Sequence, residues 1–328
     1  MDAYETDAIR NIVVVGHGSV GKTTFAEAAL FATGATTRMG SVEEQNTVSD
    51  YDDDEHKRKF SLNLSILPVE YEATKINLID TPGYADFISE VICGVAAADA
   101  ALVVVDAVSG PEVGTDRAWS IADGASLPRL ALINRMDRDN ANFQLAVDAL
   151  QARWGKKLVP LQLPIGSQAD FGGVIDLLSS QALIGAEGNP EEIPADMQAD
   201  AEAARNALIE AIVENDEDLM NKYFEDEELS PEELETALRA GITEGQIVPI
   251  LCASSTQQIG VRAALGAISS LAPSPAAARP VEIEGAELHA DPTAVPVARV
   301  FKTAADPYVG KLTYLRVLQG TVASDSHL

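Results

Sequence analysis

The sequence predicts a doubly wound α/β fold with a mainly parallel sheet, an inserted α+β subdomain, and the first strands of an all-β module at the end. Three observations favour this class. Short apolar runs alternate with helix-like stretches from Asn11 onward, a glycine-rich loop joins the first run to the first helix, and the rhythm breaks at residue 158 before it resumes near residue 246. With 328 residues, of which 46% are hydrophobic, the chain is long enough to bury a substantial core.

Residues 1–157 are predicted to form the first part of the main domain. The apolar run at residues 11–15 has the pattern of a buried strand, and Lys22–Phe31 has that of a helix. A polar stretch covers residues 36–59. Beyond it we expect strands at 61–69, 75–79, 101–106 and 129–133, and helices at 85–98, 114–122 and 143–154. This order is typical of a parallel sheet covered on both faces.

Residues 158–245 are predicted to form an acidic inserted subdomain, with strands at 158–166 and 172–178 and helices at 195–215 and 231–240. Between Glu187 and Arg239, 18 acidic residues stand against three basic ones, a balance of −15 within a total of −28. The first of these helices has one apolar stripe, formed by Leu208, Ile209, Ile212 and Val213. We therefore expect its acidic face to lie in solvent.

After the insertion the main domain resumes over residues 246–275, with a strand at 246–254 and a helix at 260–271. Residues 276–293 are predicted to be a linker, because this part of the chain begins in a stretch rich in proline and alanine. Residues 294–328 are expected to begin an all-β barrel, with strands at 295–303 and 310–323. These are too few strands to close a barrel, so we expect the chain to be truncated there.

Composition excludes several classes of protein. The chain has no apolar run of about 18 residues, and its first ten residues are charged, so we expect a cytoplasmic protein without a membrane partner. Cys93 and Cys252 lie in unrelated segments, which indicates neither a disulfide framework nor a zinc site. A net charge of −28 should repel free DNA.

A phosphate-binding loop is predicted where GHGSVGKT matches the pattern GxxxxGK[ST] between the first strand and the first helix. Backbone amides of the loop can surround phosphate oxygens. Lys22 can neutralise the β- and γ-phosphates, Thr23 can ligate Mg²⁺, and Thr24 would lie near the α-phosphate. The loop residues expected at the nucleotide are Gly16, His17, Gly18, Ser19, Val20, Gly21, Lys22, Thr23 and Thr24. An ATPase or kinase built on the same loop stays open at this point.

The base is predicted from Asn134, Arg135 and Asp137, which follow a core strand. The Asp137 carboxylate can accept hydrogen bonds from N1 and N2 of guanine, whereas adenine has no donor at either position. A site built for one base can reject the other by a factor of about 10⁴. These residues favour GTP and GDP over ATP. Arg135 can cover the base with its aliphatic stem, and Ala253, Ser254 and Ser255 follow the last core strand, where donors near the guanine oxygen are expected.

A switch is predicted at DTPG, residues 80–83, which also ends a strand. Asp80 is placed to hold Mg²⁺ through water, and the Gly83 amide can contact the γ-phosphate. Loss of that phosphate would release the segment that follows. We therefore expect Lys22 and Gly83 to act at the reacting phosphate.

The motifs GHGSVGKTT, DTPGYADF, NRMDR and LCAS, in this order, resemble those of the translational GTPases and most closely those of elongation factor G. Residues 162–166, 216–230 and 306–317 resemble its inserted subdomain and the start of its second domain, a β-barrel. The resemblance implies a monomeric GTPase that acts on the ribosome and meets a basic stalk protein through its acidic insertion. Tetracycline-resistance-type and release-factor-type relatives stay open, because they differ mainly in domains further along the chain.

Three departures from the family pattern concern the reaction. The family's RGIT is Arg58-Lys59-Phe60-Ser61 here, and Ser61 keeps a hydroxyl that can ligate Mg²⁺. Ser19 stands where the family has Asp, and Tyr84 stands where it has a catalytic His. A Tyr hydroxyl, with a reference pKa of about 10, does not become charged near neutral pH as His does. We expect slow hydrolysis without ribosomes. The alternatives are that Tyr84 only packs under the segment that follows, or that the protein is a ribosome-bound GTP sensor with little hydrolysis.

Overall fold

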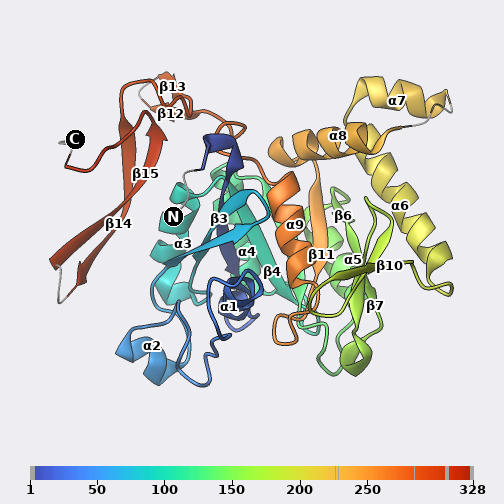
Figure 1. Cartoon of the computed structure of the whole chain (residues 1–328), viewed down its shortest axis with the longest axis horizontal. Helices are drawn as coiled ribbons and strands as arrows, with labels where there is room; N and C mark the ends of the chain where they lie inside the picture. Colours follow the sequence, from blue (N-terminus) through green and yellow to red (C-terminus); the bar gives the residue numbers. More distant parts are fainter. Residues whose placement is uncertain (1–3, 226, 228, 284, 307–309, 326–328) are drawn as a thin grey trace.

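The computed structural model describes residues 4–225, 227, 229–283, 285–306 and 310–325. Its centre is a seven-stranded sheet in the order β2-β3-β1-β4-β5-β11-β6 (Figure 1). The strands are β1 (Ile9–Gly16), β2 (Ser65–Tyr71), β3 (Thr74–Asp80), β4 (Ala100–Asp106), β5 (Arg129–Asn134), β6 (Leu158–Pro160) and β11 (Val248–Cys252). β2 is antiparallel to β3, and the other pairs are parallel. The predicted fold class is confirmed.

Helices cover both faces of this sheet. One face carries α1 (Lys22–Ala32) and α9 (Val261–Leu271), and the other carries α3 (Ile88–Ala97), α4 (Val113–Gly124) and α5 (Phe143–Trp154). The sequence of β1 is continuously apolar because both faces of this strand are buried. Ile12 and Val14 pack in the core under α1 and α9, whereas Val13 and Val15 pack in the core under α3, α4 and α5. Burial on both faces requires apolar side chains at every position of a central strand.

The inserted segment forms a second layer beside the main sheet (Figure 1). Its antiparallel sheet has the order β10-β9-β8-β7. The elements are β7 (Gln162–Ile165), β8 (Gly173–Asp176), β9 (Gln181–Ile184), β10 (Asn189–Glu191), α6 (Gln198–Val213), α7 (Glu217–Phe224) and α8 (Pro231–Thr243). The predicted stripe on α6 is turned inward, with Leu208, Ile212 and Val213 buried and Ile209 packed against the same core. β6 falls within the predicted insertion, but it pairs with β11 at the edge of the main sheet.

The end of the chain forms two antiparallel pairs. β12 (Val281–Ile283) pairs with β13 (Ala286–Leu288) inside the stretch predicted as a linker, and β14 (Val297–Asp306) pairs with β15 (Gly310–Gln319). Residues 307–309 and 326–328 of the predicted barrel module lie outside the described residues. Figure 1 places β14 and β15 at the opposite end of the molecule from α6 and α7.

Short helices occupy several connections. α2 (Asp53–Arg58) lies within the polar stretch, and the helix predicted from residue 85 begins as the 3₁₀-helix η2 (Ala85–Phe87) before α3 starts. Two further 3₁₀-helices are η1 (Thr6–Ala8) and η3 (Gln168–Asp170). Within the described ranges, no helix has both the length and the apolar content needed to cross a membrane.

Candidate nucleotide-binding site

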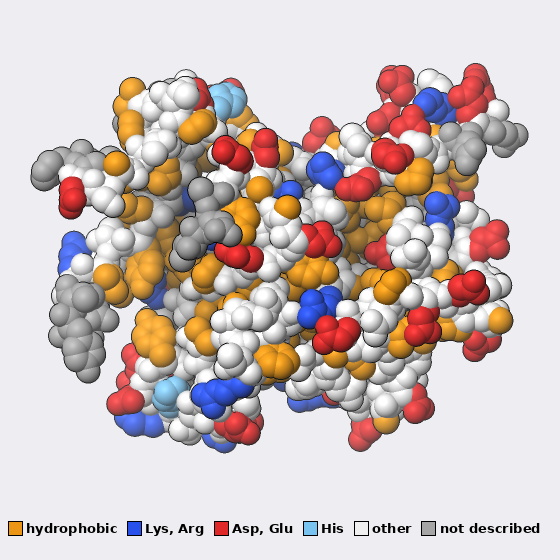
Figure 2. Space-filling model, viewed as in Figure 1, with side chains coloured by type: hydrophobic (Ala, Val, Ile, Leu, Met, Phe, Trp, Pro, Cys, Tyr) orange, Lys and Arg blue, Asp and Glu red, His pale blue; other side chains and the backbone are white. Residues whose placement is uncertain are grey.

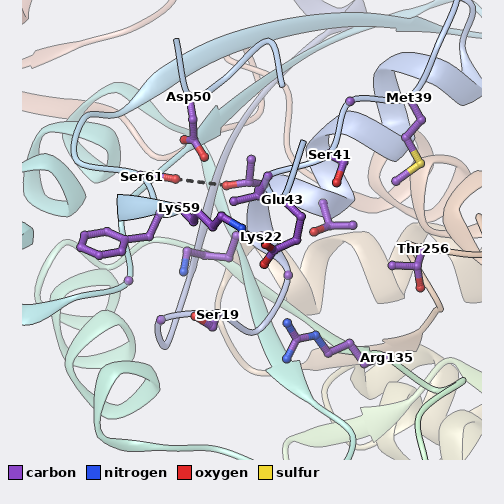
Figure 3. A pocket seen from close by; sticks show the side chains of 18 of the residues that line it. Ser19, Lys22, Met39, Ser41, Glu43, Asp50, Lys59, Ser61, Arg135 and Thr256 are labelled. Atoms are coloured by element: carbon purple, nitrogen blue, oxygen red, sulfur yellow. Dashed lines mark hydrogen bonds and ion pairs between the residues drawn. The ribbon is translucent and has the colours of Figure 1, made fainter. Parts of the chain in front are cut away.

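A cavity of about 470 Å³ lies at the carboxyl ends of the parallel strands, the usual ligand position in an open α/β sheet. Figure 3 shows its wall. Ser19 comes from the loop after β1 and Lys22 from the start of α1, whereas Arg135 and Thr256 lie on the other side. The long connection to β2 contributes Met39, Ser41, Glu43, Lys59 and Ser61. The predicted residues that line it are Gly18, Ser19, Gly21, Lys22, Thr23, Thr24, Ser61, Gly83, Tyr84 and Arg135.

Glycines are required in the loop between β1 and α1. A Cβ at Gly16 would collide with the carbonyl oxygen of Val104, and one at Gly21, where φ is +94°, would meet the Asn134 amide. The Lys22 ammonium is buried and donates hydrogen bonds to the carbonyl oxygens of Gly16, at 3.2 Å, and His17, at 2.7 Å. Burial lowers the pKa of Lys22 to about 8. A phosphate in the cavity would compensate this desolvation, since it brings negative charge to the ammonium.

The three residues predicted to hold Mg²⁺ meet at one point. Thr23 Oγ1 donates a hydrogen bond to Asp80 Oδ2 at 2.7 Å. It also lies 3.1 Å from Ser61 Oγ, the contact drawn as a dashed line from Ser61 in Figure 3. Asp80 is 1% exposed, its Oδ1 has no hydrogen-bond partner among the described residues, and burial raises its pKa. Hydroxyl and carboxylate oxygens are ligands that Mg²⁺ prefers. The residues present therefore fit this ion.

Two further polar residues at this point were not predicted as site residues. Ser49 Oγ donates a hydrogen bond to Asp80 Oδ2 at 2.8 Å. Asp50 lines the cavity near Ser61 (Figure 3), and burial raises its pKa to about 7, with the nearby carboxylate of Asp80 adding to the effect. Asp50-Tyr51 precedes Arg58-Lys59-Phe60-Ser61 and resembles an acidic-aromatic pair of the family, which is the sequence signal that could have identified Asp50. An extra carboxylate beside Asp80 makes this end of the cavity suitable for a cation.

Asn134 joins the phosphate loop to the segment after β11. Its Nδ2 donates hydrogen bonds to the carbonyl oxygens of Val20, at 3.2 Å, and Gly21, at 3.3 Å. Its Oδ1 accepts from the amide of Ser255, at 3.1 Å, and from the hydroxyl of Ser255, at 2.8 Å. With Asn134 1% exposed, these bonds hold two sides of the site in fixed positions.

Asp137 has the acceptor that the base prediction requires. Its Oδ2 accepts a hydrogen bond from Thr256 at 3.2 Å, and its buried Oδ1 has no partner among the described residues. Thr256 lines the cavity and was not predicted, although it directly follows Ser255. A buried carboxylate oxygen without a donor is suited to a ligand that supplies one, as guanine does.

Other predicted residues make contacts that hold the wall in place. The backbone amides of Ala253, Ser254 and Ser255 donate to Ile133 O, Ile259 O and Asn134 Oδ1. Val20 is 2% exposed in the core. The His17 ring lies against the start of α4, where Nδ1 accepts a hydrogen bond from the Gly114 amide at 3.2 Å. Arg135 donates to Asp106 Oδ2 at 2.7 Å, which holds its stem along the cavity.

Gly83 and Tyr84 lie directly against the phosphate loop. A Cβ at Gly83 would collide with the Gly18 amide and the Lys22 ammonium, so only glycine allows this approach. Tyr84 is 39% exposed; its ring centroid is 4.6 Å from that of Phe60, and its hydroxyl oxygen lies 3.4 Å from Ser19 Oγ. Tyr84 therefore lines the cavity beside the phosphate loop.

The fold and this arrangement define a P-loop domain built to bind a guanine nucleotide. Residues 7–274 match the elongation factor Tu GTP binding domain, and the chain belongs to that family, the translational GTPases. As a member of this family, it is a GTP-binding domain of the GTPase type.

A crystal structure of a protein from Thermus thermophilus is similar to this chain, with a TM-score of 0.86 and 34% sequence identity. The likeness covers 96% of this chain and 46% of that one. This chain therefore spans a little under half of the length of that protein. The superfamily expected from the four motifs is confirmed.

Proposed function

We propose that this chain is the GTP-binding part of an elongation factor G-like protein that hydrolyses GTP on the ribosome. The proposal is carried by the unit inserted between α5 and β11, since residues 162–166 and 216–230 resemble the inserted subdomain of elongation factor G. The domain organisation follows from it: a GTPase domain over 1–157 and 246–275, the inserted subdomain over 158–245, a linker over 276–293, and the start of a β-barrel over 294–328.

In this proposal the chain's own groups bind and orient the nucleotide. Amides of the phosphate loop and the Lys22 ammonium bind the phosphates, and Asn134 and Asp137 select guanine. Thr23, Ser61 and Asp80 would hold Mg²⁺, which when bound neutralises charge on the β- and γ-phosphates. The 3.1 Å approach of the Thr23 and Ser61 hydroxyls and the partnerless Asp80 Oδ1 support this assignment.

The switch would depend on Gly83. Its close approach to Gly18 and Lys22 supports a role for the Gly83 amide as a donor to the γ-phosphate. When that phosphate leaves, the donor loses its acceptor, and the segment from Tyr84 into α3 is free to move.

The proposed ribosomal partner of the inserted subdomain is a basic stalk protein. Figure 2 shows acidic side chains gathered at the end of the molecule that carries α7 and α8. Beside them, on α7, Phe224 is 76% exposed and Tyr223 is 37% exposed. An apolar anchor within an acidic rim suits a basic protein surface better than RNA phosphates. The charge would speed encounter, and we propose that the protein is a cytoplasmic monomer.

Binding to ribosomes tests this partner. The protein should sediment with ribosomes in the presence of a non-hydrolysable GTP analogue, and less with GDP. Phe224→Ala should weaken binding, and added salt should slow association because the rim is charged. The matched control is Tyr71→Ala, an aromatic residue outside the insertion that packs against the main core. Equal sedimentation with both nucleotides would contradict the proposal.

A second candidate is a ribosome-bound GTP sensor with little hydrolysis, and Tyr84 is the observation that favours it. Tyr84 contacts Phe60 and lies near Ser19, so in this proposal a phenol ring occupies the position beside the phosphates where the family has an imidazole. GTP turnover measured on ribosomes separates the two candidates. A sensor would bind GTP and ribosomes with no acceleration, whereas an enzyme would be accelerated from a slow basal rate.

A further inference from the structure

Three departures from the family pattern meet at one end of the cavity, although they are far apart in the sequence. Ser19 replaces an acidic residue, Lys59 replaces a glycine, and Tyr84 replaces a histidine. Tyr84 lies 3.4 Å from Ser19 between their hydroxyl oxygens, and its ring contacts Phe60, which directly follows Lys59. The result is one fewer negative charge and one more positive charge around the same space.

Lys59 is held in a conformation that favours glycine. It directly follows α2 as its C-cap, with φ at +57° and ψ at +39°, and its amide donates to Glu55 O at 2.7 Å. The left-handed region is unfavourable for a residue with a Cβ, so a lysine here has a conformational disadvantage that a glycine would not have.

The Lys59 side chain extends along the cavity wall and forms an ion pair with Glu43, which also lines the cavity. Figure 3 shows both side chains on the same side as Lys22, away from Thr256 and Arg135. The two side chains are 47% and 76% exposed. An ion pair this exposed adds little stability, so the ammonium can change partner readily.

The position of Ser61 shows which part of a nucleotide Lys59 faces. Ser61 follows Lys59 by two residues, and its hydroxyl lies 3.1 Å from that of Thr23, at the end of the cavity where the β- and γ-phosphates belong. Thr256, whose hydroxyl donates to Asp137 at the predicted base site, lies at the opposite end of the cavity. A cation at Lys59 is therefore near the phosphate that distinguishes GTP from GDP.

We propose that Lys59 binds the terminal phosphate of GTP and pairs with Glu43 when that phosphate is absent. Lys59 is then a residue that selects GTP over GDP, and it couples the long connection before β2 to the nucleotide state. This inference rests on GTP binding and deepens the proposed function, because it adds a positive charge at the reacting phosphate that the family pattern lacks.

Equilibrium binding of a non-hydrolysable GTP analogue and of GDP tests this role without relying on turnover. Lys59→Met should weaken binding of the analogue roughly tenfold or more while GDP binding changes little. Lys59→Gly should show the same loss. Because glycine adopts the left-handed conformation without strain, misfolding of this variant would not explain the loss. Lys59→Arg should retain most of the selectivity. Glu43→Gln should strengthen binding of the analogue, because the competing carboxylate is removed.

Lys57→Met is the matched control, since Lys57 lies on α2 two residues before Lys59, pairs with Asp54, and has a side chain that is 73% exposed. Equal weakening for GTP analogue and GDP, no change in Lys59→Met, or the same effect in Lys57→Met would overturn the role of Lys59. Failure of the wild-type protein to bind either nucleotide would instead overturn the GTP site itself.

Discussion

Lys302, on β14, donates a hydrogen bond to the carboxylate of Glu90, on α3, at 2.8 Å. The same ammonium donates to Leu64 O at 3.1 Å, and Glu90 accepts from the Leu64 amide at 2.8 Å. Lys302 thus joins the strand pair at the end of the chain to both segments that flank the cavity: the one that leaves Ser61 and the helix that follows Tyr84. Movement of either segment should therefore be transmitted to β14.

The first prediction concerns this link. Lys302→Met should lower the free energy of unfolding by about 3 kcal/mol. This is the lower end of the range for breaking a buried ion pair, because the Glu90 side chain retains some contact with solvent. Hydrogen exchange should become faster in residues 62–66 and 88–92. Lys311→Met, an exposed change on β15, is the control and should alter neither measurement. Exchange that stays unchanged in both segments would contradict the link.

The second prediction concerns the base. Wild-type protein should prefer GTP to inosine triphosphate, which lacks the N2 amino group, by roughly tenfold, the worth of one hydrogen bond to a charged acceptor. Asp137→Ala should lose this preference and bind GTP at least about 100-fold more weakly. Asp139→Ala, an exposed change two residues on, should keep both properties. If Asp137→Ala still discriminated between the two nucleotides, another group would read the amino group.

The third prediction concerns pH. Glu27 is 1% exposed, accepts hydrogen bonds from the amides of Val48, at 2.6 Å, and Gly40, at 3.1 Å, and has its pKa raised by burial above the ordinary 4.5. A raised pKa means that the folded chain binds more protons than the unfolded chain, so stability falls as pH rises from 4.5 through the raised value.

Thermal unfolding of the nucleotide-free protein measures this effect. The melting temperature of the wild type should decline relative to that of Glu27→Gln as the pH increases over this window. Glu44→Gln, an exposed change in the same segment, should follow the wild type at every pH. A difference between wild type and Glu27→Gln that does not vary with pH would show that the Glu27 pKa is ordinary.

The fourth prediction concerns magnesium. Asp80→Asn removes a carboxylate whose pKa is raised by burial, so the nucleotide-free protein should be at least as stable as the wild type. With Mg²⁺ and GTP at about one hundred times its Kd, the wild type should gain about 2.7 kcal/mol. Removing Mg²⁺ with a chelator should reduce this gain in the wild type and change little in Asp80→Asn. Asp86→Asn, at an exposed position, should keep the magnesium effect. If the chelator reduced the gain equally in the wild type and in Asp80→Asn, the assignment of Asp80 to Mg²⁺ would be contradicted.

Much of the fold could be predicted because its signals are local. The apolar runs of β1, β4 and β5, and the helices α1 and α5, follow directly from hydrophobic pattern, and the glycine spacing of the phosphate loop locates the site. β10 could not be predicted, since its three residues are exposed and include Pro190. The pairing of β6 with β11 joins residues about 90 positions apart, so it cannot be predicted from a local sequence pattern.

Site residues that belong to a sequence motif could be predicted. Residues that reach the site only through the tertiary path of a long connection could not. Asn134 and Asp80 are the last residues of β5 and β3, and Asp137 follows β5 by three residues, so the apolar pattern of these strands locates all three. Ser49 and Asp50 reach the same point through the long connection between α1 and β2, which has no hydrophobic periodicity. The contact of Tyr84 with Phe60 likewise depends on how that connection folds back over the phosphate loop. Such placements depend on tertiary packing, so a sequence pattern leaves them open.

Single-turnover GTP hydrolysis with and without ribosomes tests the central claim most directly, in the wild type and in Tyr84→His. We predict slow hydrolysis by the protein alone, acceleration by ribosomes of several orders of magnitude, and a faster reaction on ribosomes in Tyr84→His, because a positioned group beside the attacking water contributes strongly to phosphoryl transfer. If ribosomes accelerated neither protein, the chain would not be a ribosome-dependent GTPase.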